Sequence, residues 1–145
     1  MIAIITTVLQ ETPERISEEL KKIDLLKHIA APILFFEGEG VGSWKEGSSY
    51  TFKLKLFKYI HLGRHEIYVK NLSRTRLETV ENGTMATVWN HEIRLEELTN
   101  GHCRYTDEIE IQAGALTLFI WTFAHLFYRH RQRKWKKIIQ DNFIY

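Results

Sequence analysis

Apolar and polar residues alternate through most of the chain. In residues 49–59, Phe52 and Leu54 alternate with Lys53 and Lys55, which predicts a strand with one buried face and one basic, solvent-facing face. Alternating or β-branched apolar runs predict six further strands, at 2–8, 33–38, 64–72, 75–81, 85–98 and 103–112. Most connections between consecutive strands are short, and this pattern is typical of an antiparallel meander.

Two Asn-Gly pairs mark expected turns in this meander. Asn82-Gly83 and Asn100-Gly101 each place two residues that tolerate positive φ between predicted strands. We therefore expect a tight hairpin at each pair.

Helical signals replace alternation after the first strand. Thr12 offers a side-chain oxygen as an N-cap and Pro13 suits a first helical position, so we expect a helix that begins at Pro13. Asp24 is the expected cap of a second short helix at 25–30.

A long helix is predicted at about 115–139. Its first half is apolar on nearly every side, whereas its second half is basic over 129–137. Because a helix that is apolar on every side must be covered on every side, we expect the first half to lie across the concave face of the sheet. These elements predict an α+β fold: a curved antiparallel sheet of about seven strands around the long C-terminal helix, with two short helices after the first strand.

Length and composition restrict the class of protein. The chain has 145 residues, which suits a single domain over 1–145. Hydrophobic residues make up 44% and charged residues 26%, which are values of an ordinary globular protein and not of a disordered one. The formal net charge of +2 gives no field that would draw the whole protein to nucleic acid, so we expect no nucleic-acid partner.

Three features bear on location. The longest apolar run, 113–128, is shorter than the roughly 18–20 residues of a membrane span and contains His125, so we interpret it as a core helix. The N-terminal apolar run lacks the basic region of a signal peptide. Cys103 is the single cysteine and has no partner for an intramolecular disulfide, which fits a reducing compartment. We therefore expect a cytoplasmic protein.

Polar residues interrupt the apolar face of three predicted strands. Residues two apart in a strand share a face, so His65, His91 and Asp107 lie among the apolar residues of their strands. A buried polar group without a partner costs about 1–3 kcal/mol, so these groups must be paired, hydrated or exposed to a cavity. One interpretation is a polar patch that orients a ligand in an apolar pocket. The alternative is hydrogen bonding within a filled core, or a bulge that turns Asp107 outward.

His91 and Asp107 are also candidates for a His–carboxylate pair, because the Asn100-Gly101 turn joins their strands. If the protein is an enzyme, they are its candidate acid–base groups. No nucleophile motif and no metal-ligand spacing accompanies them, so we expect no metal and no cofactor. The ligand-binding candidates are the polar and aromatic residues of the predicted cavity walls: Phe52, His65, Trp89, His91, Tyr105, Asp107, Trp121 and His125.

The basic half of the last helix allows two interpretations. Its cations are Arg129, Arg131, Arg133, Lys134, Lys136 and Lys137. Cations near a helix C-terminus are favoured by the helix dipole, which predicts a solvated and stabilised helix end. The alternative is a patch that binds an anionic membrane surface, with Trp135 as an interfacial anchor.

Three segments carry a resemblance to a known superfamily. They are a strand in which His91 follows Trp89 by two residues, the run YTDEIEIQAG at 105–114, and the helix end FYRHRQRKW at 127–135. Over essentially its whole length the chain resembles the START-like superfamily, also called the SRPBCC or polyketide cyclase/Bet v 1-like group, and within it a small bacterial branch of ligand-binding domains. The resemblance implies a helix-grip fold with a deep cavity. It implies no single reaction, because the superfamily includes carriers, receptors, cyclases and oxygenase domains.

The leading hypothesis is a binding or carrier module for an apolar or amphipathic small molecule, such as a lipid, a polyketide or an aromatic compound. One alternative is a cyclase, dehydratase or hydrolase that uses His91 and Asp107. Another is docking on a membrane or a protein partner through the basic helix end. In the leading hypothesis the glycine-rich segment 38–49 is the expected gate for the ligand. Sheet edges can pair, so both a monomer and a homodimer remain open.

Overall fold

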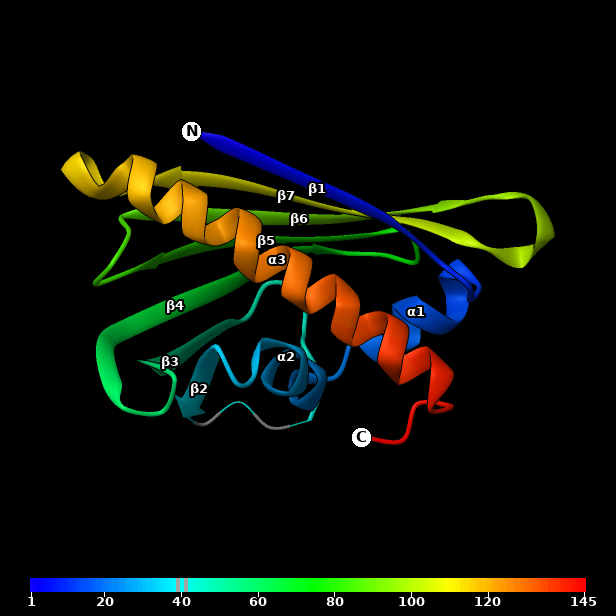
Figure 1. The fold of residues 1–145 in the computed structure, drawn as a ribbon. Helices are drawn as coiled ribbons and strands as arrows, with labels where there is room; N and C mark the ends of the chain where they lie inside the picture. The colour runs from blue at the N-terminus through cyan, green and yellow to red at the C-terminus, as the bar shows by residue number, and fades with distance from the viewer. Residues whose placement is uncertain (39, 41) are drawn as a thin grey trace.

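The computed structural model describes residues 1–38, 40 and 42–145 of the chain. Within them, a 7-stranded antiparallel sheet curls around a long helix, α3 (Figure 1). The strand order is β1-β7-β6-β5-β4-β3-β2, so only the position of β1 beside β7 departs from a simple meander. In chain order the elements are β1 (Ile2–Leu9), α1 (Pro13–Leu20), α2 (Ile23–Ala30), β2 (Leu34–Gly38), β3 (Ser49–Leu56), β4 (Ile60–Leu72), β5 (Arg76–Gly83), β6 (Val88–Glu97), β7 (Cys103–Gln112) and α3 (Thr117–Gln140).

This arrangement confirms the predicted α+β helix-grip fold, with two short helices after the first strand. α1 begins at Pro13, and the Thr12 side chain accepts a backbone hydrogen bond as its N-cap. α2 begins at Ile23, earlier than predicted, and no side chain caps it. The predicted cap at Asp24 is therefore wrong. Asp24 lies instead in the first turn of α2, where its negative charge suits the helix dipole.

The two Asn-Gly pairs have different outcomes. Asn100-Gly101 turns the chain from β6 to β7 with φ values of 66° and 71°, as predicted. The hairpin predicted at Asn82-Gly83 is wrong, because β5 continues through Gly83 and the turn follows it. Glycine is needed there for a close approach of strands, since a side chain would collide with the Arg64 carbonyl of β4.

The connection between β3 and β4 is tighter than predicted. β3 ends at Leu56 and β4 begins at Ile60, whereas the sequence predicted these limits at 59 and 64. Phe57 and Lys58 form the turn with φ values of 51° and 68°. Gly63 then lies at a register shift between the two strands with a φ of 86°, which glycine adopts without strain. A bulge of this kind bends the strand pair and helps the sheet to curl.

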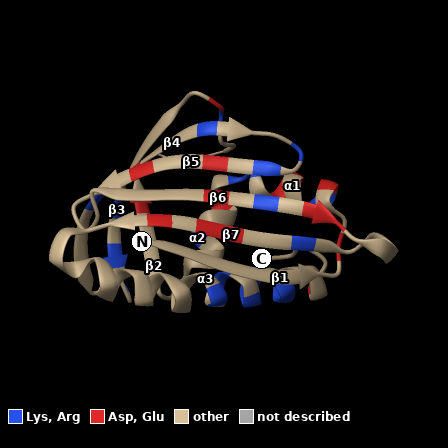
Figure 2. Cartoon of the chain, turned by 90° about the horizontal axis from the view of Figure 1, so that it is seen from above, with Lys and Arg blue, Asp and Glu red and all other residues tan. Residues whose placement is uncertain are grey.

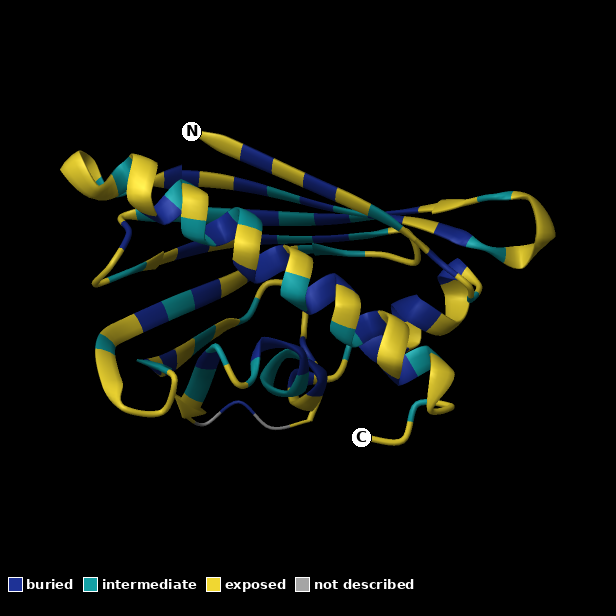
Figure 3. Cartoon of the chain, viewed as in Figure 1, coloured by how far each residue is buried: buried dark blue, intermediate teal, exposed yellow. Residues whose placement is uncertain are grey.

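Burial along α3 follows a stripe that runs through both halves of the helix. In the apolar half, Leu118, Phe119 and Leu126 are 62%, 72% and 64% exposed, whereas Arg131 and Trp135 of the basic half are buried. Figure 3 shows buried and exposed segments alternating along the helix. The prediction that the first half is covered on every side is therefore wrong, because helical periodicity brings one face of each half to the sheet. Among the described residues, no helix is both long and apolar enough to cross a membrane.

Two side chains of α3 donate hydrogen bonds to the backbone of β1. Trp121 donates its indole N–H to the Ile2 carbonyl, and Gln132 donates its amide N–H to the Ile5 carbonyl, both at 2.8 Å. β1 is an edge strand of the sheet. The bond from Trp121 therefore satisfies a carbonyl group on the free edge of β1 that would otherwise be open to pairing with another chain, whereas Gln132 bonds to a carbonyl group on the β7 side of the strand.

The segment between β2 and β3 packs on the junction of α1 and α2. Backbone hydrogen bonds join Ile23 N–H to Gly42 O at 2.9 Å and Trp44 N–H to Lys21 O at 2.8 Å. The Trp44 side chain is buried. Residues 39 and 41 of the predicted gate lie outside the described residues, so the gating role stays a prediction.

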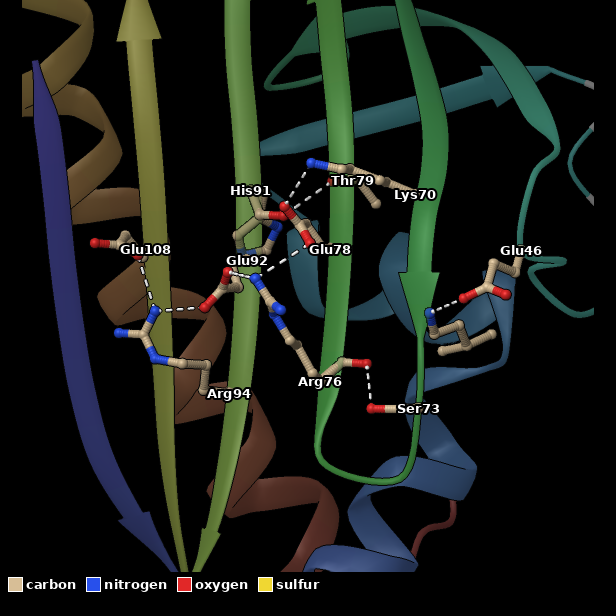
Figure 4. A network of polar contacts seen from close by, with 11 residues as sticks. Glu46, Lys70, Ser73, Arg76, Glu78, Thr79, His91, Glu92, Arg94 and Glu108 are labelled. Atoms are coloured by element: carbon tan, nitrogen blue, oxygen red, sulfur yellow. Dashed lines mark hydrogen bonds and ion pairs between the residues drawn. The ribbon is translucent and has the colours of Figure 1, made fainter.

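The outer face of the sheet carries charges of both signs (Figure 2). Arg94 donates to Glu92 at 2.6 Å and to Glu108 at 2.8 Å, and Arg76 donates to Glu92 at 2.6 Å. Glu78 extends this series of opposite charges toward β4 (Figure 4). Because the signs alternate across four strands, this face presents no large field of one sign.

Candidate ligand cavity

A cavity of about 190 Å³ lies between the sheet and the helices α2 and α3. Met85 and Phe119 line it and are 40% and 72% exposed, so they mark the side on which it reaches solvent. Most of the wall is apolar, as in small-molecule pockets generally. Its apolar residues include Leu26, Ile29, Phe36, Leu54, Ile67, Leu77, Ile93, Phe123 and Phe127.

A cluster of three buried polar side chains from β4 and β5 forms part of the wall. His65 Nε2 lies 2.6 Å from Glu81 Oε2, and the Thr79 hydroxyl donates to Glu81 Oε1 at 2.5 Å. Burial raises the pKa of Glu81, but the hydrogen bond and charge of His65 lower it, and the net pKa lies below the ordinary value of 4.5. Glu81 is therefore a carboxylate whose oxygens are occupied by neighbours.

The sequence analysis predicted His65 for this site but missed Thr79 and Glu81. A signal for both was present, because Leu77, Thr79 and Glu81 alternate along β5 and all three are buried.

A second cluster of polar side chains connects β6, β7 and α3. His91 Nε2 lies 2.7 Å from Asp107 Oδ1, which confirms the predicted His–carboxylate pair. Gln132 donates to Asp107 Oδ2 at 3.0 Å as well as to β1. His91 lines the cavity, whereas Asp107 is fully buried behind it. Asp107 can therefore orient His91 but does not itself reach a ligand in the cavity.

Trp89 and Tyr128 form a third polar contact in the wall. The indole N–H of Trp89 donates to the Tyr128 hydroxyl oxygen at 3.0 Å. Burial raises the pKa of Tyr128 above its ordinary value, so the side chain remains a neutral phenol. Its oxygen accepts from Trp89, and its own O–H is left as a donor on the cavity side.

Arg131 brings a buried positive charge to the same wall. Its side chain lines the cavity, and only 5% of the residue is exposed. The guanidinium lies 4.9 Å from the ring centroid of Tyr128 and 5.8 Å from that of Phe127. Sequence reasoning placed Arg131 in a surface patch, and its burial corrects that prediction. The signal for burial is its spacing of four residues from both Phe127 and Trp135.

Only three of the eight ligand-binding candidates line the cavity, namely His65, Trp89 and His91. Phe52 and Tyr105 are fully buried in the core, Tyr105 against Trp135 with ring centroids 5.8 Å apart. Trp121 lies at the edge of β1, and His125 packs on its ring at 4.4 Å. Together with Asp107, these side chains lie outside the cavity wall. For Trp121 and His125 the reason is the rotation of α3, which turns both toward β1.

The basic end of α3 is smaller than the predicted patch. Arg131 is buried, and Trp135, the predicted interfacial anchor, is 0% exposed. Arg129, Arg133 and Lys136 remain on the helix surface, where they flank a groove beside β1. Figure 2 shows Lys and Arg side by side along this part of α3.

The described residues hold no group of three or more His, Cys, Asp or Glu side chains that could bind a metal ion. The chemistry that the wall offers is therefore hydrogen bonding, the guanidinium of Arg131 and two imidazoles that are each backed by a carboxylate, all beside a larger apolar surface.

Comparisons with known proteins show the fold and no more. No family model matches the sequence, and no curated protein matches it. Protein CV1439 from Chromobacterium violaceum has a similar solved structure, with a TM-score of 0.76 and 14% identity over 94% of this chain and 95% of that chain. A conserved protein from Geobacillus kaustophilus gives a TM-score of 0.67 and 17% identity over 97% of this chain and 96% of that chain.

DynU16, from the dynemicin biosynthetic locus, is also similar, with a TM-score of 0.64 and 10% identity. The match covers 96% of this chain but 47% of DynU16. These likenesses define the class of the protein as a single curved antiparallel sheet closed by a C-terminal helix.

Proposed function

We propose that this protein binds an apolar or amphipathic small molecule in the cavity between the sheet, α2 and α3, and that it is a member of the START-like superfamily. The observation that carries the proposal is the cavity wall, which is apolar except for a few hydrogen-bonding groups. The volume of about 190 Å³ is below the roughly 300–1,000 Å³ of typical ligand pockets. It therefore favours a compact ligand over a long-chain lipid.

Native mass spectrometry of freshly purified protein tests this proposal directly. We expect a stoichiometric adduct, which extraction under denaturing conditions would release for identification. In the variant Ile67→Phe, a larger side chain would occupy part of the cavity, so the adduct should be lost.

The matched control for this variant is Ile4→Phe, which makes the same change on β1 at a position that is 55% exposed and outside the cavity. The control should retain the adduct. A bare chain mass in the unmodified protein, together with no binding of added aromatic compounds, would contradict the proposal.

Acid–base catalysis is a second candidate function, which the position of His91 favours. His91 reaches the cavity and is held by Asp107, an arrangement that fixes the tautomer and the orientation of the imidazole. Incubation of the protein with the extracted molecule would test for conversion. Turnover that is lost in His91→Gln while binding persists would support catalysis, and recovery of the molecule unchanged would count against it.

A cytoplasmic location is also part of the proposal. Burial raises the pKa of the Cys103 thiol to about 11, so this cysteine is a protonated, inert core residue. Such a cysteine is compatible with a reducing compartment.

A further inference from the structure

Arg131 lacks a polar partner in the part of the chain that the structure describes. Its Nε is completely enclosed without a hydrogen-bond acceptor, and no described carboxylate oxygen lies within the 4.0 Å of an ion pair. A buried charge is unfavourable unless it is paired and hydrogen-bonded. The cavity wall therefore contains one guanidinium that has no direct ion-pair or hydrogen-bond partner among the described residues.

Burial lowers the pKa of this guanidinium, whereas the two buried carboxylates nearby, Glu81 and Asp107, attract it and raise that pKa, but neither of them forms an ion pair or a hydrogen bond with it. Glu81 is occupied by His65 and the Thr79 hydroxyl. Asp107 is occupied by His91 and Gln132. Each carboxylate thus has its own partners, and the guanidinium of Arg131 is available to a third group.

The surroundings of Arg131 hold its charge beside the cavity. The rings of Tyr128 and Phe127 lie within cation–π range, which offsets part of the desolvation of the guanidinium. The Tyr128 hydroxyl accepts a hydrogen bond from Trp89 and has its own proton free to donate. Two donor groups, Arg131 and Tyr128, therefore line the same wall.

We propose that the ligand of this cavity carries a carboxylate, which Arg131 binds with help from the Tyr128 hydroxyl while the apolar body of the ligand lies along the remaining wall. The planar fork of a guanidinium matches a carboxylate in geometry. Glu81 and Asp107 already bring negative charge close to Arg131, so a ligand with one negative charge is favoured over a dianion such as phosphate. This inference rests on the proposed binding function and gives its ligand a chemical class.

The test is calorimetric titration at pH 7 with two aromatic probes of the same shape, 2-naphthoic acid and its neutral amide, 2-naphthamide. We expect the acid to bind about tenfold or more tightly than the amide, as a charge-assisted hydrogen bond gives. In Arg131→Met this preference should disappear, through weaker binding of the acid and undiminished binding of the amide. Arg131→Lys, which keeps the charge but loses the fork, should retain part of the preference.

The matched control is Arg104→Met, which removes a guanidinium that pairs with Glu96 on the exposed face of β7. This variant should bind both probes as the unmodified protein does. Thermal unfolding gives an independent measurement. Because Arg131 is unpaired without ligand, Arg131→Met should be at least as stable as the unmodified protein, and a large loss of stability would overturn the inference.

The remaining outcomes separate the two proposals. Equal binding of acid and amide, or a neutral molecule in the native extract, would overturn the carboxylate inference and leave the cavity function intact. If neither probe binds detectably but the purified protein carries a different, neutral adduct, the carboxylate inference is again overturned and the cavity function is kept. A bare native mass without binding of either probe would remove the cavity function and this inference together.

Discussion

At the scale of single residues, each cavity histidine is held by a buried carboxylate. His65 is held by Glu81 and His91 by Asp107, at 2.6 and 2.7 Å. Each carboxylate has a further donor, Thr79 in one case and Gln132 in the other. Buried pairs of this kind fix side-chain positions, and the loss of one partner leaves the other uncompensated.

This pairing predicts how the protein responds to acid. Because the pKa of Glu81 is lower in the folded protein than its ordinary value of 4.5, its stabilising effect is complete above that pH and is lost as the pH falls through the lower folded pKa. Glu81→Gln should lower the free energy of unfolding by about 3 kcal/mol at pH 7 and flatten the decrease below pH 4.5.

Urea denaturation between pH 3 and pH 7 measures both effects of Glu81→Gln. Glu96→Gln is the control, because the Glu96 side chain is 63% exposed in a surface ion pair. An unchanged acid dependence in Glu81→Gln would show that Glu81 is not the group that titrates.

At the scale of elements, α3 stabilises the fold through a stripe that crosses its apolar and basic halves. Trp135 in the basic half is 0% exposed and packs on Tyr105, whereas Leu118 in the apolar half is 62% exposed. The average polarity of each half of α3 therefore does not show which side chains stabilise the fold. The period of the helix relative to the sheet determines which side chains are buried.

Alanine substitution should separate the two halves. Trp135→Ala removes a large buried side chain, and we expect it to lower the free energy of unfolding by about 3–5 kcal/mol. Leu118→Ala should change it by less than about 0.5 kcal/mol, because the side chain is on the surface. Equilibrium unfolding in urea would measure the free energy of unfolding of both variants. An equal decrease in the two variants would contradict the stripe of buried residues along α3.

The same stripe explains which parts of the site could be predicted. Alternation within strands has a period of two, so it assigned His65, His91 and Asp107 to the inner face correctly. Helical spacing tells which residues of α3 share a face, but packing against the sheet decides which face is buried. Trp121 and His125 were therefore predicted in the cavity but lie toward β1.

At the scale of the whole molecule, the fold could be predicted because it depends on pattern more than on residue identity. Solved structures with 14% and 17% identity share it at TM-scores of 0.76 and 0.67. The size of the cavity could not be predicted in the same way. Its volume depends on which inward-facing side chains fail to fill the space under α3, and this is a property of the complete packing.

The distribution of charge over the molecule predicts weak attraction to membranes. The outer sheet face alternates in sign, Trp135 is buried, and Lys137 pairs with Asp141 at 3.2 Å. At physiological salt we expect no co-sedimentation with vesicles that contain anionic phospholipid, because exposed charges are screened. Salt-resistant co-sedimentation that is lost in Arg133→Glu, with Arg104→Glu as the control, would establish the membrane alternative instead.

The tryptophans of the cavity wall can serve as intrinsic fluorescent reporters of ligand binding. Trp44 and Trp89 line the cavity, whereas Trp121 lies at the β1 edge and Trp135 is enclosed in the core. A bound molecule would change the surroundings of the first two indoles and leave the other two as a constant background. Ultraviolet emission from the unlabelled chain should therefore shift when the cavity is filled, and Trp89→Phe should reduce that shift.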